Sequence, residues 1–315
     1  MNATKEHFPP DHQDTASDSV GASDVETPLH RFISDFCESK VALAGLFIFV
    51  MLIGIALLAP LLAPQDPYDL AQLDIMDNRL PPGEKNMAFG YTYWLGTDDQ
   101  GRDMLSGIFF GLRTSLGVGA MSALLALMFG GAMGLLAAYF GGRTDTLIMR
   151  IVDLQLSFPA ILIALVLLAI LGQGVDKIII ALVTVQWAYY ARTVRGTALV
   201  ERRKEYIEAA VCLALSHTRI VFKHLLPNCL PPLIVVATVQ VAHAIALEAT
   251  LSFLVIGLPI TEPSLGLLIA NGFEYMLSGK YWISFFPGIA LLITIVSINL
   301  VGDQLRDVLN PRLQK

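Results

Sequence analysis

Two ionisable side chains lie inside a long apolar segment, residues 230–256, and they are the first candidates for chemistry in this chain. They are His243 and Glu248. A charge at the middle of a bilayer costs about 2.5–3.5 kcal/mol on insertion scales, so Glu248 is expected to face a bundle interior or water. Two roles stay open for it. Either Glu248 and Ser252 line or gate a pathway, or Glu248 makes a helix–helix hydrogen bond, to Ser252 or to a partner.

Other chemistry is poorly represented in the sequence. His243 need not share a helix face with Glu248, and the two supply too few ligands for a metal site. The three cysteines have neither metal-ligand spacing nor a disulfide framework. No phosphate-binding loop of the GxxxxGK[ST] type is present, because Gly279-Lys280 lacks the earlier glycine and is followed by Tyr281. We therefore expect no enzyme activity, no cofactor and no metal.

The composition indicates a polytopic membrane protein. Of the 315 residues, 55% are hydrophobic and only 15% are charged, whereas an ordinary soluble domain is about 25% charged. Six apolar segments are each long enough to cross a bilayer at about 1.5 Å per residue. We therefore predict an all-α membrane protein with six transmembrane helices, at residues 41–62, 115–140, 147–171, 178–199, 230–256 and 282–301.

The basic residues indicate the orientation. With the N-terminus inside, the outer segments hold only Arg79, Lys85, Arg102, Lys177 and Lys280, with Arg113 at the outer edge. Because Lys and Arg concentrate on the cytoplasmic side, we predict both ends inside. The predicted order is a disordered cytoplasmic tail (1–40), a first transmembrane helix (41–63), an outer loop (64–112), a transmembrane core (113–302) that includes a cytoplasmic loop (201–228), and a cytoplasmic C-terminal tail (303–315).

Two contacts are expected between or along the predicted helices. Gly130 and Gly134 form a GxxxG face, which permits close helix packing. Arg150 and Asp153 are three residues apart on one predicted helix, so they are expected to form an ion pair.

The cytoplasmic loop 201–228 is the longest polar interruption in the second half of the chain. Its apolar residues recur at helical spacing, and Pro227 is expected to end the pattern. This predicts a short amphipathic helix or helix pair, whose small alanines would let another surface come close. From the pattern alone, a helix that lies on lipid headgroups is an equal alternative.

The amino-acid sequence of this loop resembles the EAA loop of permease subunits in bacterial ABC importers, and most closely that of the peptide/nickel class. Glu208-Ala209-Ala210, then position 214, then His224-x-x-Pro227 has the family's spacing, with Ala214 where the family has Gly. Other stretches resemble the same class in the expected order, from about residue 40 to residue 312. They are residues 95–98, 101–103, 111–116, 248–254, 263–266, 287–288 and 299–312.

The resemblance implies the type I ABC importer permease fold, in a multi-pass protein of the bacterial inner membrane. It implies a coupling helix that binds a cytoplasmic ATPase subunit, made of Glu208, Ala209, Ala210, Leu213, Ala214, Leu215, His224 and Pro227. The outer loop becomes periplasmic, and its motif is either a plug or a contact for a binding protein: Gly96, Thr97, Asp98, Gly101, Arg102 and Asp103.

The implied partners are a second homologous permease, two ABC ATPases, a periplasmic solute-binding protein and the lipid bilayer, with no nucleic acid. The implied function is ATP-driven import of di- or oligopeptides. Nickel or another small solute is the first alternative. An ATP-independent secondary transporter or channel, and a membrane scaffold without transport, are competing classes.

Overall fold

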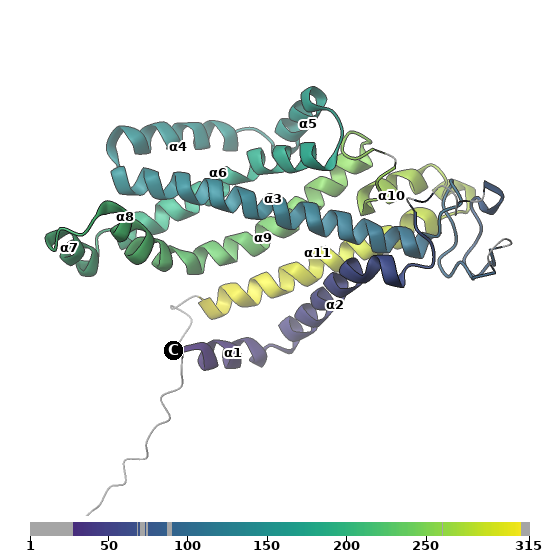
Figure 1. The fold of residues 1–315 in the computed structure, drawn as a ribbon, viewed down its shortest axis with the longest axis horizontal. Helices are drawn as coiled ribbons and strands as arrows, with labels where there is room; N and C mark the ends of the chain where they lie inside the picture. The colour runs from purple at the N-terminus through teal and green to yellow at the C-terminus, as the bar shows by residue number, and fades with distance from the viewer. Residues whose placement is uncertain are drawn as a thin grey trace, which may run out of the picture.

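The structure is a computed structural model that describes residues 28–67, 69, 73, 75–86, 90–259 and 261–309. The described part is helical, with only two isolated β-bridges and no strand. Five long helices run together along the molecule (Figure 1): α2 (Lys40–Leu62), α3 (Met104–Phe140), α6 (Val175–Glu201), α9 (Leu226–Phe253) and α11 (Trp282–Leu309). The predicted all-α class is confirmed.

Shorter elements surround these five helices. They are α1 (Pro28–Glu38), η2 (Ile75–Asp77), α4 (Gly142–Leu156), α5 (Ala160–Leu171), α7 (Glu205–Cys212), α8 (His217–Arg219), the π-helix η3 (Ile220–Leu225), α10 (Leu265–Phe273) and η4 (Met276–Ser278). In Figure 1, α1, α7 and the end of α11 lie towards one end of the molecule, and the loop that precedes α3 lies at the other. In this arrangement α1, the end of α11 and loop 201–228 share one end of the described structure.

Four helices are long and apolar enough to cross a membrane: α2, α3, the continuous run His217–Phe253, and α11. A fifth span is possible if α4 and α5 count together, but these two helices meet at 91°. The span predicted over residues 147–171 is therefore divided into two helices. Pro159 lacks a backbone N–H and disfavours helical backbone in Phe158, which explains the break. The predicted fourth span corresponds to α6, which is long enough but more polar.

Three boundaries differ from the sequence prediction. Helix α3 begins at Met104 and not at residue 115, because the Asp103 side chain accepts the Ser106 N–H at 2.8 Å and caps the helix. Helix α1 occupies part of the predicted tail, of which residues 1–27 lie outside the described residues. Pro227 does not end the helical pattern, because the π-helical turn Ile220–Leu225 runs directly into α9 and Pro227 continues that run.

The predicted glycine face brings α3 against α6. A Cβ atom on Gly130 would lie 2.2 Å from the Trp187 carbonyl oxygen, and one on Gly134 would lie 2.3 Å from that of Ala191. Only glycine permits such a close approach of backbones, so the GxxxG prediction is confirmed.

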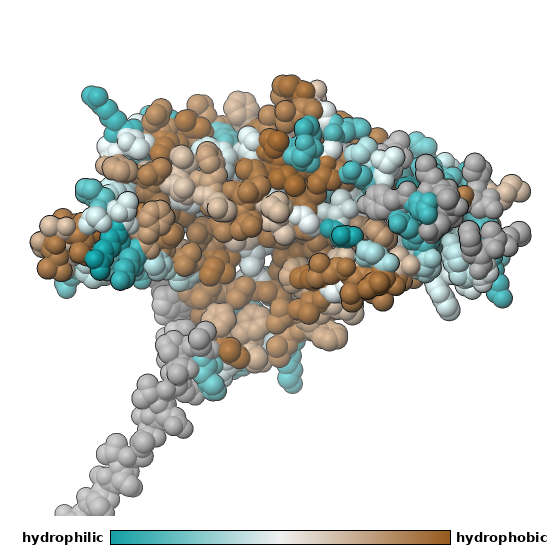
Figure 2. All heavy atoms as spheres, in the orientation of Figure 1, coloured by the Kyte–Doolittle hydropathy of each residue, from teal (hydrophilic) through white to brown (hydrophobic). Residues whose placement is uncertain are grey.

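Hydrophobic side chains cover the middle of the face in Figure 2, and hydrophilic ones gather towards its two ends. Large apolar side chains are exposed on the outer helices, such as Phe47 on α2 and Ile170 on α5, which are 71% and 77% exposed. Exposed apolar side chains on the outer helices suit contact with lipid tails or a membrane partner.

Candidate functional site

Helix α7 carries the Glu208-Ala209-Ala210 motif and is held by its inner face. Ile207 and Ala210 are buried in a small cluster with Ile220, at the start of the long helix that becomes α9. Glu208 and Ala209 are exposed on the outer face. Leu213, directly after the helix, is 73% exposed. The amphipathic helix predicted from the loop is therefore present, and its motif is divided between a buried and an open face.

Ala214 ends α7 in the backbone conformation that glycine usually supplies. Its φ is +51°. The Ala214 N–H donates to the Val211 carbonyl at 2.9 Å, and the Leu215 N–H donates to the Ala210 carbonyl at 3.2 Å. This pair of bonds is the Schellman motif, which satisfies the last carbonyls of a helix. Where the resembled pattern has glycine, this chain thus places alanine in a left-handed backbone conformation.

The remaining residues of the loop lie on the helical run His217–Phe253. His224 is half-buried and Pro227 is exposed. The His224 carbonyl accepts a hydrogen bond from the Asn228 side chain at 2.6 Å. The π-helical turn Ile220–Leu225 joins α8 to α9 without a break, so the buried face of α7 rests on the same helix that crosses the bundle.

An ion pair fixes the start of the loop. Lys204 contacts the Glu201 carboxylate at 2.7 Å, and the Tyr206 hydroxyl donates to the same carboxylate at 2.7 Å. Burial, together with this acceptor, raises the pKa of Tyr206 to about 12. The hydroxyl therefore stays protonated near neutral pH and keeps donating to Glu201.

Glu248 is fully buried between α9 and α3. Its two carboxylate oxygens accept hydrogen bonds from Ser115 Oγ at 2.7 Å and from Ser252 Oγ at 2.8 Å. Ser252 was the expected partner on the same helix, and Ser115 adds a partner on another. Glu248 thus makes the helix–helix hydrogen bond that was one of its two expected roles.

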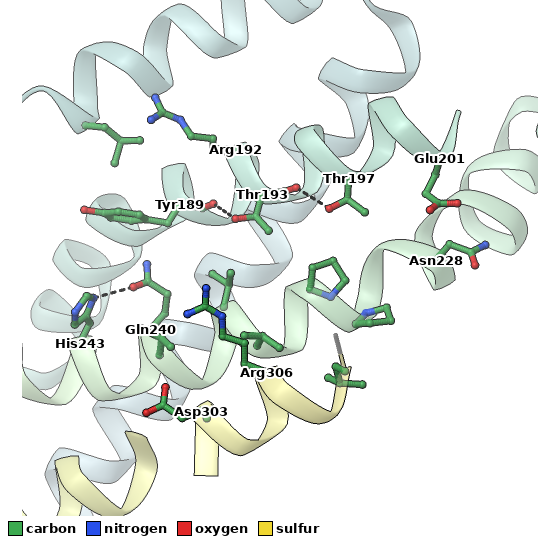
Figure 3. Close-up of a pocket in the computed structure, with 18 residues that line it drawn as sticks. Tyr189, Arg192, Thr193, Thr197, Glu201, Asn228, Gln240, His243, Asp303 and Arg306 are labelled. Carbon is green, nitrogen blue, oxygen red and sulfur yellow. Dashed lines mark hydrogen bonds between the residues drawn. The ribbon is translucent and has the colours of Figure 1, made fainter. Parts of the chain in front are cut away.

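A cavity of about 1050 Å³ opens between α6, α9 and α11. Figure 3 shows its polar side chains: Tyr189, Arg192, Thr193 and Thr197 from α6, Gln240 and His243 from α9, and Asp303 and Arg306 from α11. A smaller cavity of about 320 Å³ adjoins it and shares Tyr189, Gln240 and His243. Among the described residues that line either cavity, Glu248 and Ser252 are not found.

Sequence reasoning missed most of this cavity. The one lining residue that it singled out in the apolar segments was His243. A signal was present, because Tyr189, Thr193 and Thr197 recur every four residues and therefore share one face of α6. That polar stripe on an otherwise apolar helix predicts a surface that faces water or a partner.

The prediction of an ion pair between Arg150 and Asp153 within α4 is wrong. Asp153 contacts Arg192 of α6 at 2.5 Å and not Arg150. Asp145, two turns earlier on α4, contacts Arg195 of α6 at 2.5 Å. Both pairs join neighbouring helices and are at least partly exposed, so each contributes only about 0–1 kcal/mol.

The motif before α3 forms a folded corner. Arg102 contacts Asp98 at 2.6 Å, and both side chains are buried. The Thr97 carbonyl accepts the Trp282 indole N–H at 3.2 Å, which attaches the corner to the start of α11. Gly96 and Gly101 have φ values of +79° and +77°. Burial raises the pKa of Asp103, the cap of α3.

Metal ligands are sparse in the part of the chain that the structure describes. It contains no group of three or more His, Cys, Asp or Glu side chains that could hold a metal ion. The polar side chains of the cavity are instead amides, hydroxyls and charged groups, which suit a solute or a protein surface.

Comparison with known proteins places these features in a family. Residues 130–315 match the family described as binding-protein-dependent transport system inner membrane component. The chain belongs to this family. Residues 27–82 also match the N-terminal transmembrane domain of oligopeptide transport permease C, so the resemblance stated from the motifs is confirmed.

Individual relatives cover most of the chain. The di/tripeptide transport system permease protein DppC of Pseudomonas aeruginosa (strain UCBPP-PA14) is 36% identical over 91% of this chain and 93% of its own. The oligopeptide transport system permease protein OppC of Bacillus subtilis (strain 168) is 36% identical over 89% and 88%. Among solved structures, the inward-facing MetNI methionine ABC transporter matches with a TM-score of 0.53 at 22% identity, over 66% of this chain and 96% of that one. This likeness confirms the type I permease fold.

Proposed function

We propose that this chain is a permease subunit of a bacterial inner-membrane ABC importer for di- or oligopeptides. It works with a second homologous permease, two cytoplasmic ATPases that hydrolyse ATP, and a periplasmic solute-binding protein. The observation that carries the substrate class is the set of relatives named as dipeptide and oligopeptide permeases, which align over nearly the whole chain. Nickel or another small solute is the alternative that the same architecture would accept.

In this proposal, α7 is the coupling helix. Support comes from its geometry: a buried face on Ile207 and Ala210 fixes it to the body, and an open face presents Glu208 and Leu213. An exposed leucine beside a carboxylate suits an apolar groove with a basic rim. The continuous helix from His217 to Phe253 would then carry motion from α7 into the membrane.

The larger cavity is proposed as this chain's share of the translocation pathway. Support comes from its polar lining inside a bundle that is otherwise apolar. Glu248 and Ser252, which were candidates for a gate, are proposed instead to fasten α9 to α3 through Ser115. The corner formed by Gly96, Thr97, Asp98, Gly101, Arg102 and Asp103 is proposed as a periplasmic plug, because its ion pair is buried and it is attached to α11.

The test is peptide uptake by the reconstituted complex, with ATPase co-purification as a second measurement. Glu208→Lys and Leu213→Asp should both reduce ATPase binding and uptake, because they alter only the open face of α7. Glu84→Lys, the same charge reversal on an exposed residue of the outer loop, is the control and should change neither. Ala210→Asp is less informative, since Ala210 is buried and the change would disturb the loop itself.

Three results would each overturn part of the proposal. Full uptake with Glu208→Lys and Leu213→Asp would remove the coupling role of α7. Uptake by the permeases without any ATPase would favour a secondary transporter. A complex that imports nickel and no peptide would shift the substrate class.

A further inference from the structure

Two glutamines at the boundary of the two cavities have amide groups that are only partly used. Gln186 on α6 and Gln240 on α9 are each only 3% exposed. Gln186 Nε2 donates to the Gln240 backbone carbonyl at 3.1 Å, which brings the two residues into contact. Gln240 Oε1 lies 3.1 Å from His243 Nδ1. The other half of each amide, Gln186 Oε1 and Gln240 Nε2, has no hydrogen-bond partner among the described residues.

Such orphaned groups are costly in an apolar bundle. A buried polar atom without a partner costs about 1–3 kcal/mol, and apolar side chains of the same shape would avoid that cost. The orientation of the Gln186 amide is fixed, because only its NH₂ group can donate to a backbone carbonyl. Its oxygen is therefore the unused atom. With His243 Nδ1 donating to Gln240 Oε1, the unused atom of Gln240 is its NH₂ nitrogen.

The position of the two glutamines points to their ligand. Both line the smaller cavity, and Gln240 also lines the larger one. Figure 3 shows Gln240 beside His243 on α9, facing Tyr189 of α6, and these three residues are common to both cavities. The two side chains therefore lie at the junction of the two cavities, with their unused acceptor and donor buried in its wall, so that a turn of the amide would bring each atom to the cavity.

We infer that Gln186 and Gln240 form a station that hydrogen-bonds the backbone of a peptide in transit. Gln186 Oε1 accepts a peptide N–H, and Gln240 Nε2 donates to a peptide carbonyl. Every residue of a peptide presents one such donor and one acceptor, so the contact is independent of side chains. This inference rests on the proposed peptide import and names the groups that contact the substrate there.

The first test measures uptake of a labelled tripeptide by the reconstituted complex with saturating binding protein. Gln186→Met and Gln240→Met keep the length of the side chain and remove the amide. Each should lower the uptake rate roughly three- to tenfold, which is the range for one lost hydrogen bond. Thr250→Val is the matched control, because Thr250 lines the smaller cavity but its hydroxyl already donates to the Ala246 carbonyl at 2.8 Å. Its uptake should equal that of the wild type.

A second test alters the peptide and leaves the wild-type protein intact. A peptide with one N-methylated backbone amide, which the binding protein still holds, lacks the hydrogen that Gln186 Oε1 would accept. The wild-type complex should import it more slowly than the parent peptide. Gln186→Met should import both peptides at the same reduced rate, whereas Thr250→Val should still distinguish them.

Three outcomes overturn the inference. If both methionine variants take up peptide at the wild-type rate, the two glutamines do not contact the peptide, and the proposed peptide import is unaffected. Loss of the second permease from the purified Gln240→Met complex means that the amide binds that subunit instead. A wild-type complex that imports no peptide overturns the proposed function, and the inference falls with it.

Discussion

Replacing Ala214 by glycine should stabilise the end of α7, although the change removes a side chain. Ala214 has a φ of +51° and is exposed to solvent. An L-residue pays about 1–2 kcal/mol in the left-handed region, and glycine pays nothing there. Because glycine also loses more backbone entropy on ordering, by about 0.5–1 kcal/mol, the net gain should be about 0.5–1 kcal/mol.

The assay is native-state hydrogen exchange at the end of α7 in the purified complex. The Leu213 N–H donates to the Ala209 carbonyl at 3.0 Å, so its exchange requires the last turn to open. In Ala214→Gly, this amide should exchange about two- to fivefold more slowly, since about 1.4 kcal/mol corresponds to a factor of ten.

The matched control is Ala209→Gly, five positions earlier and also exposed. Ala209 lies inside α7 with helical backbone, where glycine costs about 1 kcal/mol relative to alanine. The same amide should therefore exchange about fivefold faster. Opposite signs at two exposed alanines would isolate the backbone conformation as the cause. Faster exchange in both variants would refute the claim that the positive φ of Ala214 is strained.

Three further predictions concern the body of the protein. Glu248→Ala should lower the free energy of unfolding by about 1–3 kcal/mol, because it leaves the Ser115 hydroxyl without its acceptor; thermal unfolding of the complex tests this, and an unchanged midpoint would contradict it. Gly130→Val should prevent folding of the α3–α6 pair. Gly117→Val should be tolerated, because a Cβ atom added at Gly117 on the same helix has no atom within 4 Å. The yield of folded complex should therefore be much lower for Gly130→Val than for Gly117→Val. Asp98→Asn should cost about 3 kcal/mol by removing one partner of a buried ion pair, and should make the outer loop sensitive to added protease; equal resistance would argue against a rigid plug.

Much of the fold could be predicted from local patterns. Apolar length located α2, α9 and α11, and the paired glycines located the contact between α3 and α6. The start of α3 was missed because the prediction followed the apolar run and overlooked its cap, Asp103, which stands directly before a helical stretch. The break at Pro159 was missed because a proline inside an apolar run can either kink a membrane helix or end it.

Contacts between distant segments were harder to predict. Asp153 has Arg150 three residues away in the sequence, yet it pairs with Arg192 of another helix. Spacing alone cannot separate these partners, because either arginine could reach the carboxylate once the helices are packed. The cavity was hard to predict for the same reason, because α6, α9 and α11 each contribute only a few of its polar residues. The helix in loop 201–228 was easier to predict, because its residues are close together in the sequence.

One helix connects the two proposed sites. The inner face of α7 packs on Ile220, and from His217 the same helical run reaches Phe253. Gln240 lies on this run and faces the cavities, and Glu248 lies two turns further on, tied to α3 through Ser115. A shift of α7 would therefore reach the cavity wall along one helical run, although the π-helical turn Ile220–Leu225 and the interior prolines Pro231 and Pro232 are points where that run can bend. The Schellman turn at Ala214 matters in this arrangement, since a loose turn would let α7 move without moving the helix.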